Sequence, residues 1–251
     1  PYATPPFDAI RLEHYEPAFD AAIACSRAEI EAIVSNPRKA TFTNTIVALE
    51  RQGALLDRIS GIFFNLLEAD TSDEMQQIAL RVQPKLTELS NDISLNAALF
   101  ARVKAVHDRP GRLDKEDRML LEKTYKRFAR QGAELPDDRK ELYRRYTSEL
   151  SELTLQFGQN ALAATNAFTL RITDPAKVSE LPDFVREAMA AEARSRGEEG
   201  WTVTLQRPSY LPFMTYSTDR ALKEKLWRAS NSCALGGEFD NTEIIRRIVN
   251  T

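Results

Sequence analysis

Apolar residues recur at intervals of three and four positions through the first two thirds of the chain, and this spacing limits the possible folds more than any other feature. Side chains at such intervals share one face of an α-helix, so each run predicts a helix with one buried face. The first helix is expected to end at Asn36-Pro37, because the residue before a proline disfavours helical geometry. Its apolar face comprises Tyr15, Phe19, Ile23, Ser26, Ile30 and Ile33.

A second uninterrupted helix is predicted from near Thr43 to Leu66, and a third follows it. Thr71 and Glu74 are spaced as a capping box for the third helix, which contains Pro84. The second face comprises Ile46, Leu49, Gly53, Leu56, Ile59, Phe63 and Leu66.

After a shorter helix, Asp114 is expected to cap one that ends near Gly132, and the longest helix follows "ELPDD". Five residues of this longest helix are spaced for burial: Leu142, Tyr146, Leu150, Leu153 and Phe157. The sequence has no fixed-period repeat, which argues against a solenoid. The helices are therefore expected to pair as antiparallel hairpins in a bundle.

The hydrophobic period changes near Phe168. "FTLRI" (residues 168–172) and "WTVTL" (residues 201–205) alternate and are rich in β-branched and aromatic residues, which predicts two short strands with one helix between them. The predicted fold class is mainly α: an antiparallel helical bundle of long hairpins with a small two-strand β element near residues 168–205.

A domain boundary is predicted between a helical bundle, residues 1–165, and a smaller region, residues 166–251. The smaller region would hold the strand–helix–strand element and the helices after it, although one continuous helical body also fits the sequence. "QRPSYLPFMTYS" is interpreted as an irregular stretch. The last helix begins with Asp240 or Asn241 as its cap and with Glu243 in capping-box spacing, yet no stop signal precedes Thr251. This ending predicts that the chain is the front part of a longer protein.

Composition excludes several classes of partner. Acidic and basic residues nearly balance, with a net charge of -3, so the sequence predicts neither a nucleic-acid partner nor binding to an anionic membrane surface. No apolar run approaches the roughly 18 residues of a membrane span. No signal peptide is visible, and the sequence does not choose between a cytoplasmic and a periplasmic location. Cys25 and Cys233 lie far apart and are expected to be buried free thiols.

The sequence offers little that could catalyse a reaction. Its two histidines, His14 and His107, could in principle converge on a metal, but ordinary histidines on helices are the favoured interpretation. The acid pairs Asp73-Glu74, Asp137-Asp138 and Glu198-Glu199 lie at predicted helix starts or in loops, where capping or solvation accounts for them. We therefore predict no catalytic residue, no metal ligand and no cofactor-binding residue in this chain.

Two kinds of cluster remain. The basic pairs Arg144-Arg145 and Arg246-Arg247 are expected on solvated helix faces. The stretch "RPSYLPFMTYS" is more informative, because two prolines fix a backbone that is dense in aromatic and apolar side chains. It could form the lip of a peptide-binding cleft, or a plug between strand and bundle, and the plug is favoured. The residues are Pro208, Tyr210, Leu211, Pro212, Phe213, Met214 and Tyr216.

Four long blocks carry a family resemblance: "PPFDAIRLEHYEPAFDAAI", "TFTNTIVALE", "GWTVTLQRPSYLPFMTYSTDRALKEKLWRA" and "GGEFDNTEIIRRI". With these blocks in order, the chain resembles the amino-terminal region of the thimet-oligopeptidase family of zinc metallopeptidases. Within the family it is most similar to the bacterial peptidyl-dipeptidases (dipeptidyl carboxypeptidases), with oligopeptidase A next. The resemblance covers essentially the whole chain.

The resemblance implies that the zinc ligands and catalytic residues lie in a second half that this chain does not contain, because no position here matches an HExxH motif. In the complete enzyme, zinc and that motif's glutamate would act on short unfolded peptides and release dipeptides from the carboxyl end. This chain would supply scaffold and channel wall, bind no zinc and be inactive alone. A non-native dimer is an expected way of covering an exposed apolar face. The alternative is a stand-alone helical module that binds peptides or a protein without catalysis.

Overall fold

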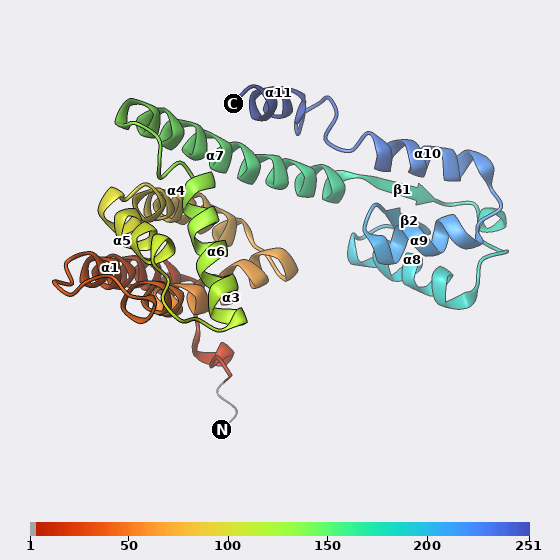
Figure 1. Cartoon of the computed structure of the whole chain (residues 1–251). Helices are drawn as coiled ribbons and strands as arrows, with labels where there is room; N and C mark the ends of the chain where they lie inside the picture. The colour runs from red at the N-terminus through yellow and green to blue at the C-terminus, as the bar shows by residue number, and fades with distance from the viewer. Residues whose placement is uncertain (1–3) are drawn as a thin grey trace. The chain divides into compact units, whose positions relative to one another are not determined.

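The computed structural model describes residues 4–251, and it confirms a mainly α fold with one small antiparallel sheet (Figure 1). The chain forms two compact units that divide in sequence between Glu152 and Leu153. We call them unit 1, which ends at Glu152, and unit 2, which begins at Leu153. The division falls inside a single long helix, α7 (Asp137–Ala167), so each unit is described by itself.

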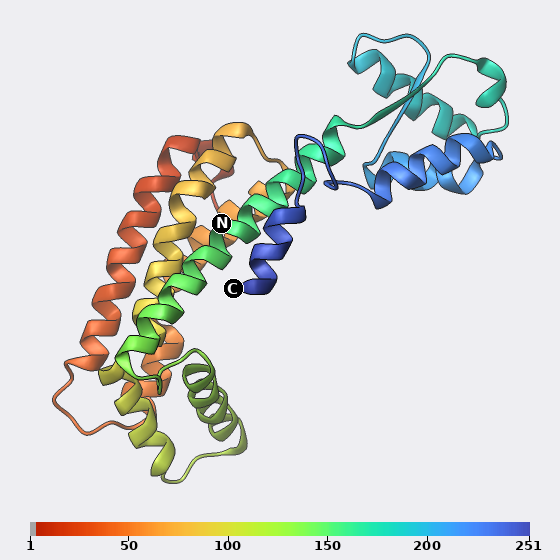
Figure 2. The same cartoon turned by 90° about the horizontal axis from the view of Figure 1, so that it is seen from above.

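Unit 1 is built from helices. Its long elements are α1 (Tyr15–Val34), α3 (Ala54–Ala69), α4 (Asp73–Ser94), α5 (Ala97–Asp108), α6 (Lys115–Arg130) and the first part of α7. Short elements are η1 (Phe7–Ala9), η2 (Leu12–His14), the π-helical η3 (Phe42–Val47) and α2 (Ala48–Arg51). Helix α1 packs on α3 and α4, and α5 packs on α6 (Figure 2).

Two apolar groups form the core of unit 1. Phe19 of α1 and Phe63 of α3 are fully buried, and their rings meet edge to face with centroids 5.5 Å apart. A second cluster joins α1, η3, α5 and α6 around Ile46, Leu99 and Leu121. Every predicted position of the apolar face of α1 is buried, together with Ala22, which confirms the period read from the sequence.

The second predicted helix is wrong as one continuous element. It consists of the π-helical η3, α2 directly after it, and α3, and Gly53, with a left-handed backbone at φ of 76°, separates α2 from α3. The predicted start of the third helix is also wrong, since the side chain of Ser72, and not that of Thr71, accepts the cap bond from the Met75 backbone. Asp114 does cap α6, as predicted, by accepting from the Asp117 backbone.

Helix α7 is the longest, as predicted, with 31 residues. Its expected apolar row is only partly buried, however. Leu153 is buried, but Tyr146 and Phe157 are 41% and 38% exposed. The spacing of this row therefore predicted more burial than Tyr146 and Phe157 have.

Unit 2 contains a two-strand sheet and the helices that pack around it. Strand β1 (Thr169–Ile172) pairs antiparallel with β2 (Trp201–Thr204), with Leu170 opposite Val203, which confirms both predicted strands. The remaining elements are η4 (Pro175–Lys177), α8 (Asp183–Ser195), α9 (Arg207–Tyr216), α10 (Arg220–Asn231) and α11 (Thr242–Asn250). The core contains Val203, Phe213 and Leu226, all fully buried.

The stretch predicted as irregular is helix α9. Pro208 lies in its first turn, where the missing N–H breaks no helical bond, and Pro212 removes only one bond from a helix of ten residues. At α11 the predicted Asp240–Glu243 capping box is absent. The Asp240 carboxylate instead accepts from the Thr242 backbone at 2.9 Å, and the buried Asn241 donates to the Phe157 carbonyl at 3.0 Å.

Candidate functional site

A cavity of about 380 Å³ lies in unit 2, between the end of α7, one face of α8, the end of β2 and the start of α9. We call it the α8–α9 pocket. Its position follows from local structure. Residues four apart on α8 share a face, and only Leu205 and Gln206 separate β2 from α9. The pocket is lined by Thr165, Asn166, Phe184, Val185, Ala188, Met189, Glu192, Arg196, Thr204, Gln206, Pro208, Ser209 and Pro212.

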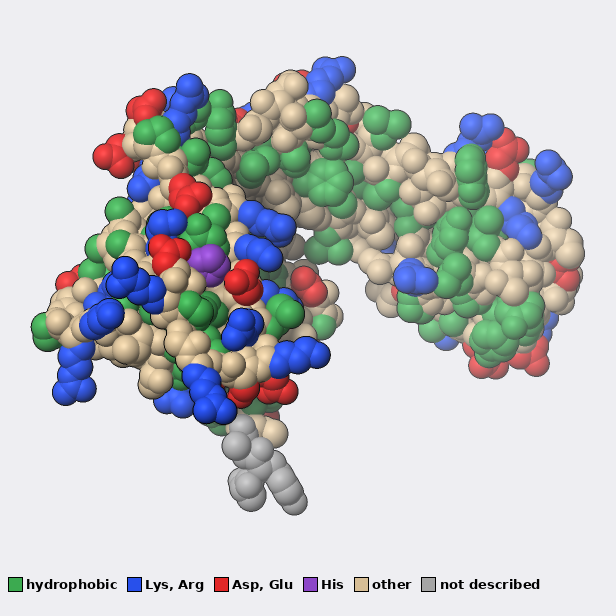
Figure 3. Space-filling model, viewed as in Figure 1, with side chains coloured by type: hydrophobic (Ala, Val, Ile, Leu, Met, Phe, Trp, Pro, Cys, Tyr) green, Lys and Arg blue, Asp and Glu red, His purple; other side chains and the backbone are tan. Residues whose placement is uncertain are grey.

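The floor of the α8–α9 pocket is apolar. Val185 and Met189 lie one turn apart on α8, and each is only 3% exposed. Phe184 is 59% exposed and forms an edge-to-face contact with Tyr216 of α9, with ring centroids 5.9 Å apart. Apolar surface therefore continues from the pocket along α9. Figure 3 shows hydrophobic side chains gathered on the visible face of unit 2.

The polar lining consists of amides, hydroxyls and one ion pair. Gln206 donates from Nε2 to Oδ1 of Asn166 at 2.6 Å. Ser209 accepts from the Thr204 backbone at 3.0 Å, which holds the start of α9 against the end of β2. On α8, Arg196 pairs with Glu192 at 2.7 Å, so the two charges offset each other.

The pocket can bind a ligand, but its residues do not form a nucleophile–base pair. Ser209 has no histidine partner within unit 2, because both histidines of the chain precede residue 153. The Glu192 carboxylate is engaged by Arg196. A largely apolar cavity with a few polar groups at its edge is typical of a recognition site.

The stretch interpreted as a lip or a plug forms α9, which buries one face in unit 2 and exposes the other. Phe213 is fully buried in the unit 2 core, with Tyr210 and Met214 packed against it. Leu211 and Tyr216 are 46% and 45% exposed. Pro208 and Pro212 line the pocket itself.

The two histidines belong to unit 1 and do not line this pocket. His14 accepts through Nδ1 from the Arg11 backbone at 3.1 Å, just before α1. His107, at the end of α5, stacks on Tyr125 with ring centroids 4.0 Å apart, and its Nε2 lies 3.3 Å from Glu122. Both contacts fit the interpretation of ordinary histidines on helices.

Acid pairs occupy the places expected of them. Asp73-Glu74 and Asp137-Asp138 lie in the first turns of α4 and α7, and Glu198-Glu199 lie in the turn before β2. In unit 1, basic and acidic side chains are both scattered over the visible face (Figure 3). Arg246 pairs with Glu243 on α11 at 3.4 Å.

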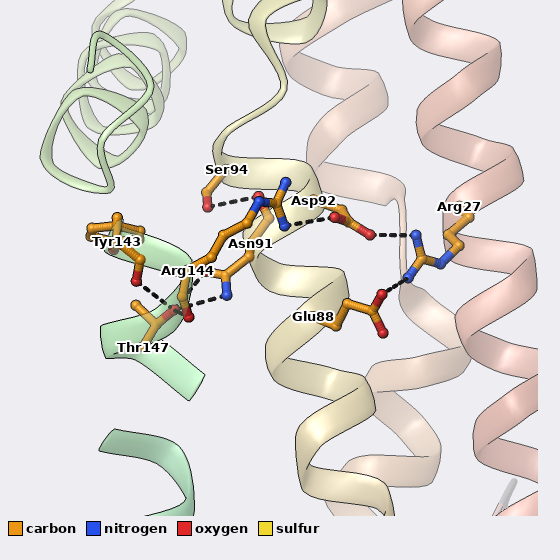
Figure 4. Close-up of polar contacts among 8 residues, drawn as sticks. All are labelled: Arg27, Glu88, Asn91, Asp92, Ser94, Tyr143, Arg144 and Thr147. Carbon is orange, nitrogen blue, oxygen red and sulfur yellow. Dashed lines mark hydrogen bonds and ion pairs between the residues drawn. The ribbon is translucent and has the colours of Figure 1, made fainter. Parts of the chain in front are cut away.

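The prediction that Arg144 lies on a solvated helix face without a specific role is wrong, because Arg144 pairs with Asp92. It donates to Oδ1 of Asp92 at 2.8 Å, and Arg27 of α1 pairs with the other oxygen of the same carboxylate (Figure 4). Beside them, the buried Asn91 donates to the Thr147 hydroxyl at 2.8 Å. These contacts join α1, α4 and the first part of α7.

Both cysteines are free, but the expectation that they are buried is wrong. Cys25 is exposed and Cys233 is partly exposed. Cys25 lies just outside the apolar face of α1, whereas its neighbour Ser26 is buried and bonds to Gln52 at 3.0 Å.

Elsewhere in unit 2, the carboxylates of Glu180 and Asp219 bond to residues at the start of α10. The Thr218 hydroxyl and backbone N–H donate to Glu180 and keep the pKa of its carboxyl below the ordinary value. The Leu222 backbone N–H donates to Asp219 at 3.0 Å and lowers the pKa of that cap residue. Lys177 lies 3.2 Å from Asp219 and adds to the same effect.

The residues present do not fit a zinc site. Between residues 4 and 251, no group of three or more histidine, cysteine or acidic side chains is placed to hold a metal ion. The same part of the chain has no helix with the length and apolar character needed to cross a bilayer.

The sequence did not single out the pocket residues Asn166, Phe184, Met189 and Gln206. The spacing of Val185, Met189 and Glu192 on α8 was the available signal for a shared face. Nothing in the sequence indicated that Asn166, at the end of α7, would meet Gln206, forty positions later.

The chain is similar in sequence to known peptidases, although no family model matches it. It is 39% identical to dipeptidyl carboxypeptidase of Salmonella typhimurium and 38% identical to that of Escherichia coli. It is 29% identical to oligopeptidase A of Salmonella typhimurium. Each match covers 99% of this chain, which spans 37% to 38% of the relative's length. Such similarity confirms the resemblance read from the sequence, and the chain belongs to the thimet-oligopeptidase family, with dipeptidyl carboxypeptidase and oligopeptidase A.

Proposed function

We propose that this chain is the scaffold and channel-wall portion of a peptidase that releases dipeptides from the carboxyl end of short peptides. The observation that carries the proposal is the similarity over 99% of the chain to proteins named dipeptidyl carboxypeptidase, at 39% and 38% identity. The identity to oligopeptidase A is lower, at 29%, which favours dipeptide release.

The geometry of unit 2 supports a role in contacting peptides. The α8–α9 pocket combines an apolar floor with uncharged polar groups, and exposed aromatic side chains continue along α9. Aromatic anchors in partly apolar pockets supply much of the affinity for peptide ligands. The helices of unit 1 would supply the scaffold.

We place the metal centre outside this chain. Since residues 4–251 provide no ligand set, zinc would be held by other residues of a complete enzyme, where it would polarise the scissile carbonyl. The 251-residue chain is then expected to bind no zinc and to cleave nothing by itself.

The test compares the 251-residue chain with the product of the complete reading frame that encodes it. Each would receive a blocked tetrapeptide with a free carboxyl end and the same peptide with an amidated end. The complete product is expected to release a dipeptide from the free-carboxyl substrate and to retain zinc after metal-free dialysis.

If the complete product cleaves the amidated and the free-carboxyl peptide equally well, it is an oligopeptidase and does not depend on a free carboxyl end. A complete product that cleaves neither peptide would contradict a peptidase role. In that case the α8–α9 pocket favours the second candidate, a helical module that binds peptides without catalysis.

A further inference from the structure

We propose that the α8–α9 pocket holds one apolar side chain of an extended peptide, and that the Asn166–Gln206 amide pair bonds to the adjoining peptide group. This inference rests on the proposed function, because it takes a short peptide as the ligand. It adds a binding subsite made entirely by unit 2.

The size and lining of the pocket suit a large side chain together with the peptide groups beside it. A volume of about 380 Å³ lies at the lower end of the range of roughly 300–1,000 Å³ found for small-molecule sites. The buried Val185 and Met189 form an apolar floor, and the exposed Phe184 offers a ring to a ligand. Burial of a leucine or phenylalanine side chain there is expected to raise affinity by roughly ten- to a hundredfold.

The amide pair gives the pocket its polar specificity. The bond from Gln206 Nε2 to Asn166 Oδ1 orients both amides. It leaves Gln206 Oε1 as an acceptor and Asn166 Nδ2 as a donor, and the residues that the structure describes show no side-chain partner for either atom. Both residues are exposed, so a ligand can reach them.

A peptide group matches this arrangement because it carries one N–H donor and one carbonyl acceptor. Charged ligands match it less well. The charged side chains in the lining are Glu192 and Arg196, which pair with each other at 2.7 Å. An uncharged stretch of peptide backbone next to an apolar side chain is therefore the ligand that the lining favours.

Methionine methyl resonances provide a direct test, because Met189 lies on the pocket floor. The chain has four methionines, and Met75 and Met119 lie in unit 1 as internal references. The 251-residue chain, labelled with carbon-13 at the methionine methyls, would be titrated with acetyl-Ala-Phe-Ala-amide. We expect a saturable shift of the Met189 signal, with Met75 and Met119 unmoved.

Two matched variants locate the effect on one face of α8. Ala188 is exposed and lines the pocket, whereas Ala191 is exposed on the same helix outside it. Ala188→Trp is expected to fill the pocket and abolish the shift, and Ala191→Trp is expected to retain it. Gln206→Leu is expected to weaken binding about three- to tenfold through loss of one hydrogen bond.

The proposal is overturned if the Met189 signal stays fixed up to the solubility limit of the peptide. It is also overturned if Ala188→Trp shifts as the unchanged chain does, or if acetyl-Ala-Gly-Ala-amide binds equally well. None of these readouts involves cleavage. A failed pocket and a failed peptidase assignment therefore give different results.

Discussion

Asp92 is the residue on which three helices of unit 1 converge. Its carboxylate accepts from Arg27 of α1 and from Arg144 of α7, while Asp92 itself lies on α4 (Figure 4). Its side chain is 31% exposed and that of Arg144 is 32% exposed, so solvent screens the pairs only in part. Loss of the carboxylate would take the counter-charge from Arg144 and leave Arg27 with only Glu88, at 4.0 Å.

We expect Asp92→Ala to lower the free energy of unfolding by about 1 to 2 kcal/mol, measured by urea denaturation. Glu88→Ala is the matched control, because Glu88 lies on the same helix and only 4.0 Å from Arg27, with 67% of its side chain exposed. That control should cost less than about 0.5 kcal/mol. Equal effects of the two variants would contradict a special role for Asp92.

Glu180 and Asp219 are expected to make unit 2 sensitive to acid. Hydrogen bonds from Thr218 and from the Leu222 backbone lower their pKa values below the ordinary 4.5 and 3.8. A lowered pKa in the folded state stabilises the fold fully above the ordinary pKa. That stabilisation is lost as the pH falls through the lowered value.

The urea midpoint is therefore expected to fall between pH 5 and pH 3, and to fall less steeply in Glu180→Gln. The comparison is with Glu187→Gln on α8, since the exposed Glu187 side chain bonds to no residue between 4 and 251. A pH dependence that Glu180→Gln leaves unchanged would show that the Thr218 contacts do not stabilise the fold.

Among the elements, the junction of α2 and α3 depends most on one residue type. Gly53 has a φ of 76°, and its N–H donates to Glu29 at 2.7 Å. A methyl group there would have room, with its nearest neighbour, Ser26 Oγ, at 4.0 Å. The cost of a side chain is therefore in the backbone conformation rather than in a clash.

Gly53→Ala is expected to destabilise the chain by about 1 to 2 kcal/mol, because L-residues disfavour left-handed geometry. Gly61→Ala, inside α3 and with open space around it, should stabilise by about 0.5 to 1 kcal/mol. Thermal unfolding is expected to show a lower melting temperature for Gly53→Ala and a higher one for Gly61→Ala. Two changes of the same sign would contradict the conformational explanation.

At this scale the sequence predicted the type of most elements and missed several of their limits. Helical periodicity located the buried positions of α1, and alternation located both strands. The same periodicity runs through Gly53, so it could not show that the backbone turns there. For α9, the two prolines suggested irregular structure, but their positions in a short helix remove few bonds.

The sequence predicted less of the α8–α9 pocket than of the helices and strands. The aromatic stretch at α9 was recognised, and Pro208 and Pro212 do line the pocket. The other side of the pocket comes from α8 and from Asn166, which only the folded chain brings near Gln206. A contact between residues forty positions apart leaves no periodic signal in a single sequence.

At the scale of the molecule, the 251-residue chain exposes large apolar side chains near its carboxyl end. Ile245 and Val249 on α11 are 48% and 77% exposed, whereas Ile244 on the other face is buried. Trp227 and Leu235 are 51% and 66% exposed in the same unit. Apolar surface of this kind promotes association between copies of a chain.

We expect the chain to self-associate at high concentration, as measured by light scattering after gel filtration. The double variant Ile245→Lys with Val249→Lys should reduce association, and Leu80→Lys, at an exposed position of α4, should not. A monomer at every concentration, with dye binding no higher than that of ordinary globular proteins, would contradict this prediction.

The amide pair at the mouth of the α8–α9 pocket has one more consequence. Asn166 and Gln206 carry no charge, so ionic strength should have little influence on what they hold. The peptide group that they recognise is the same at nearly every position of a polypeptide. A ligand could therefore shift by one residue and present the next apolar side chain to the same floor. Such a pocket would select for unfolded chains by their backbone and tolerate wide variation in their sequence.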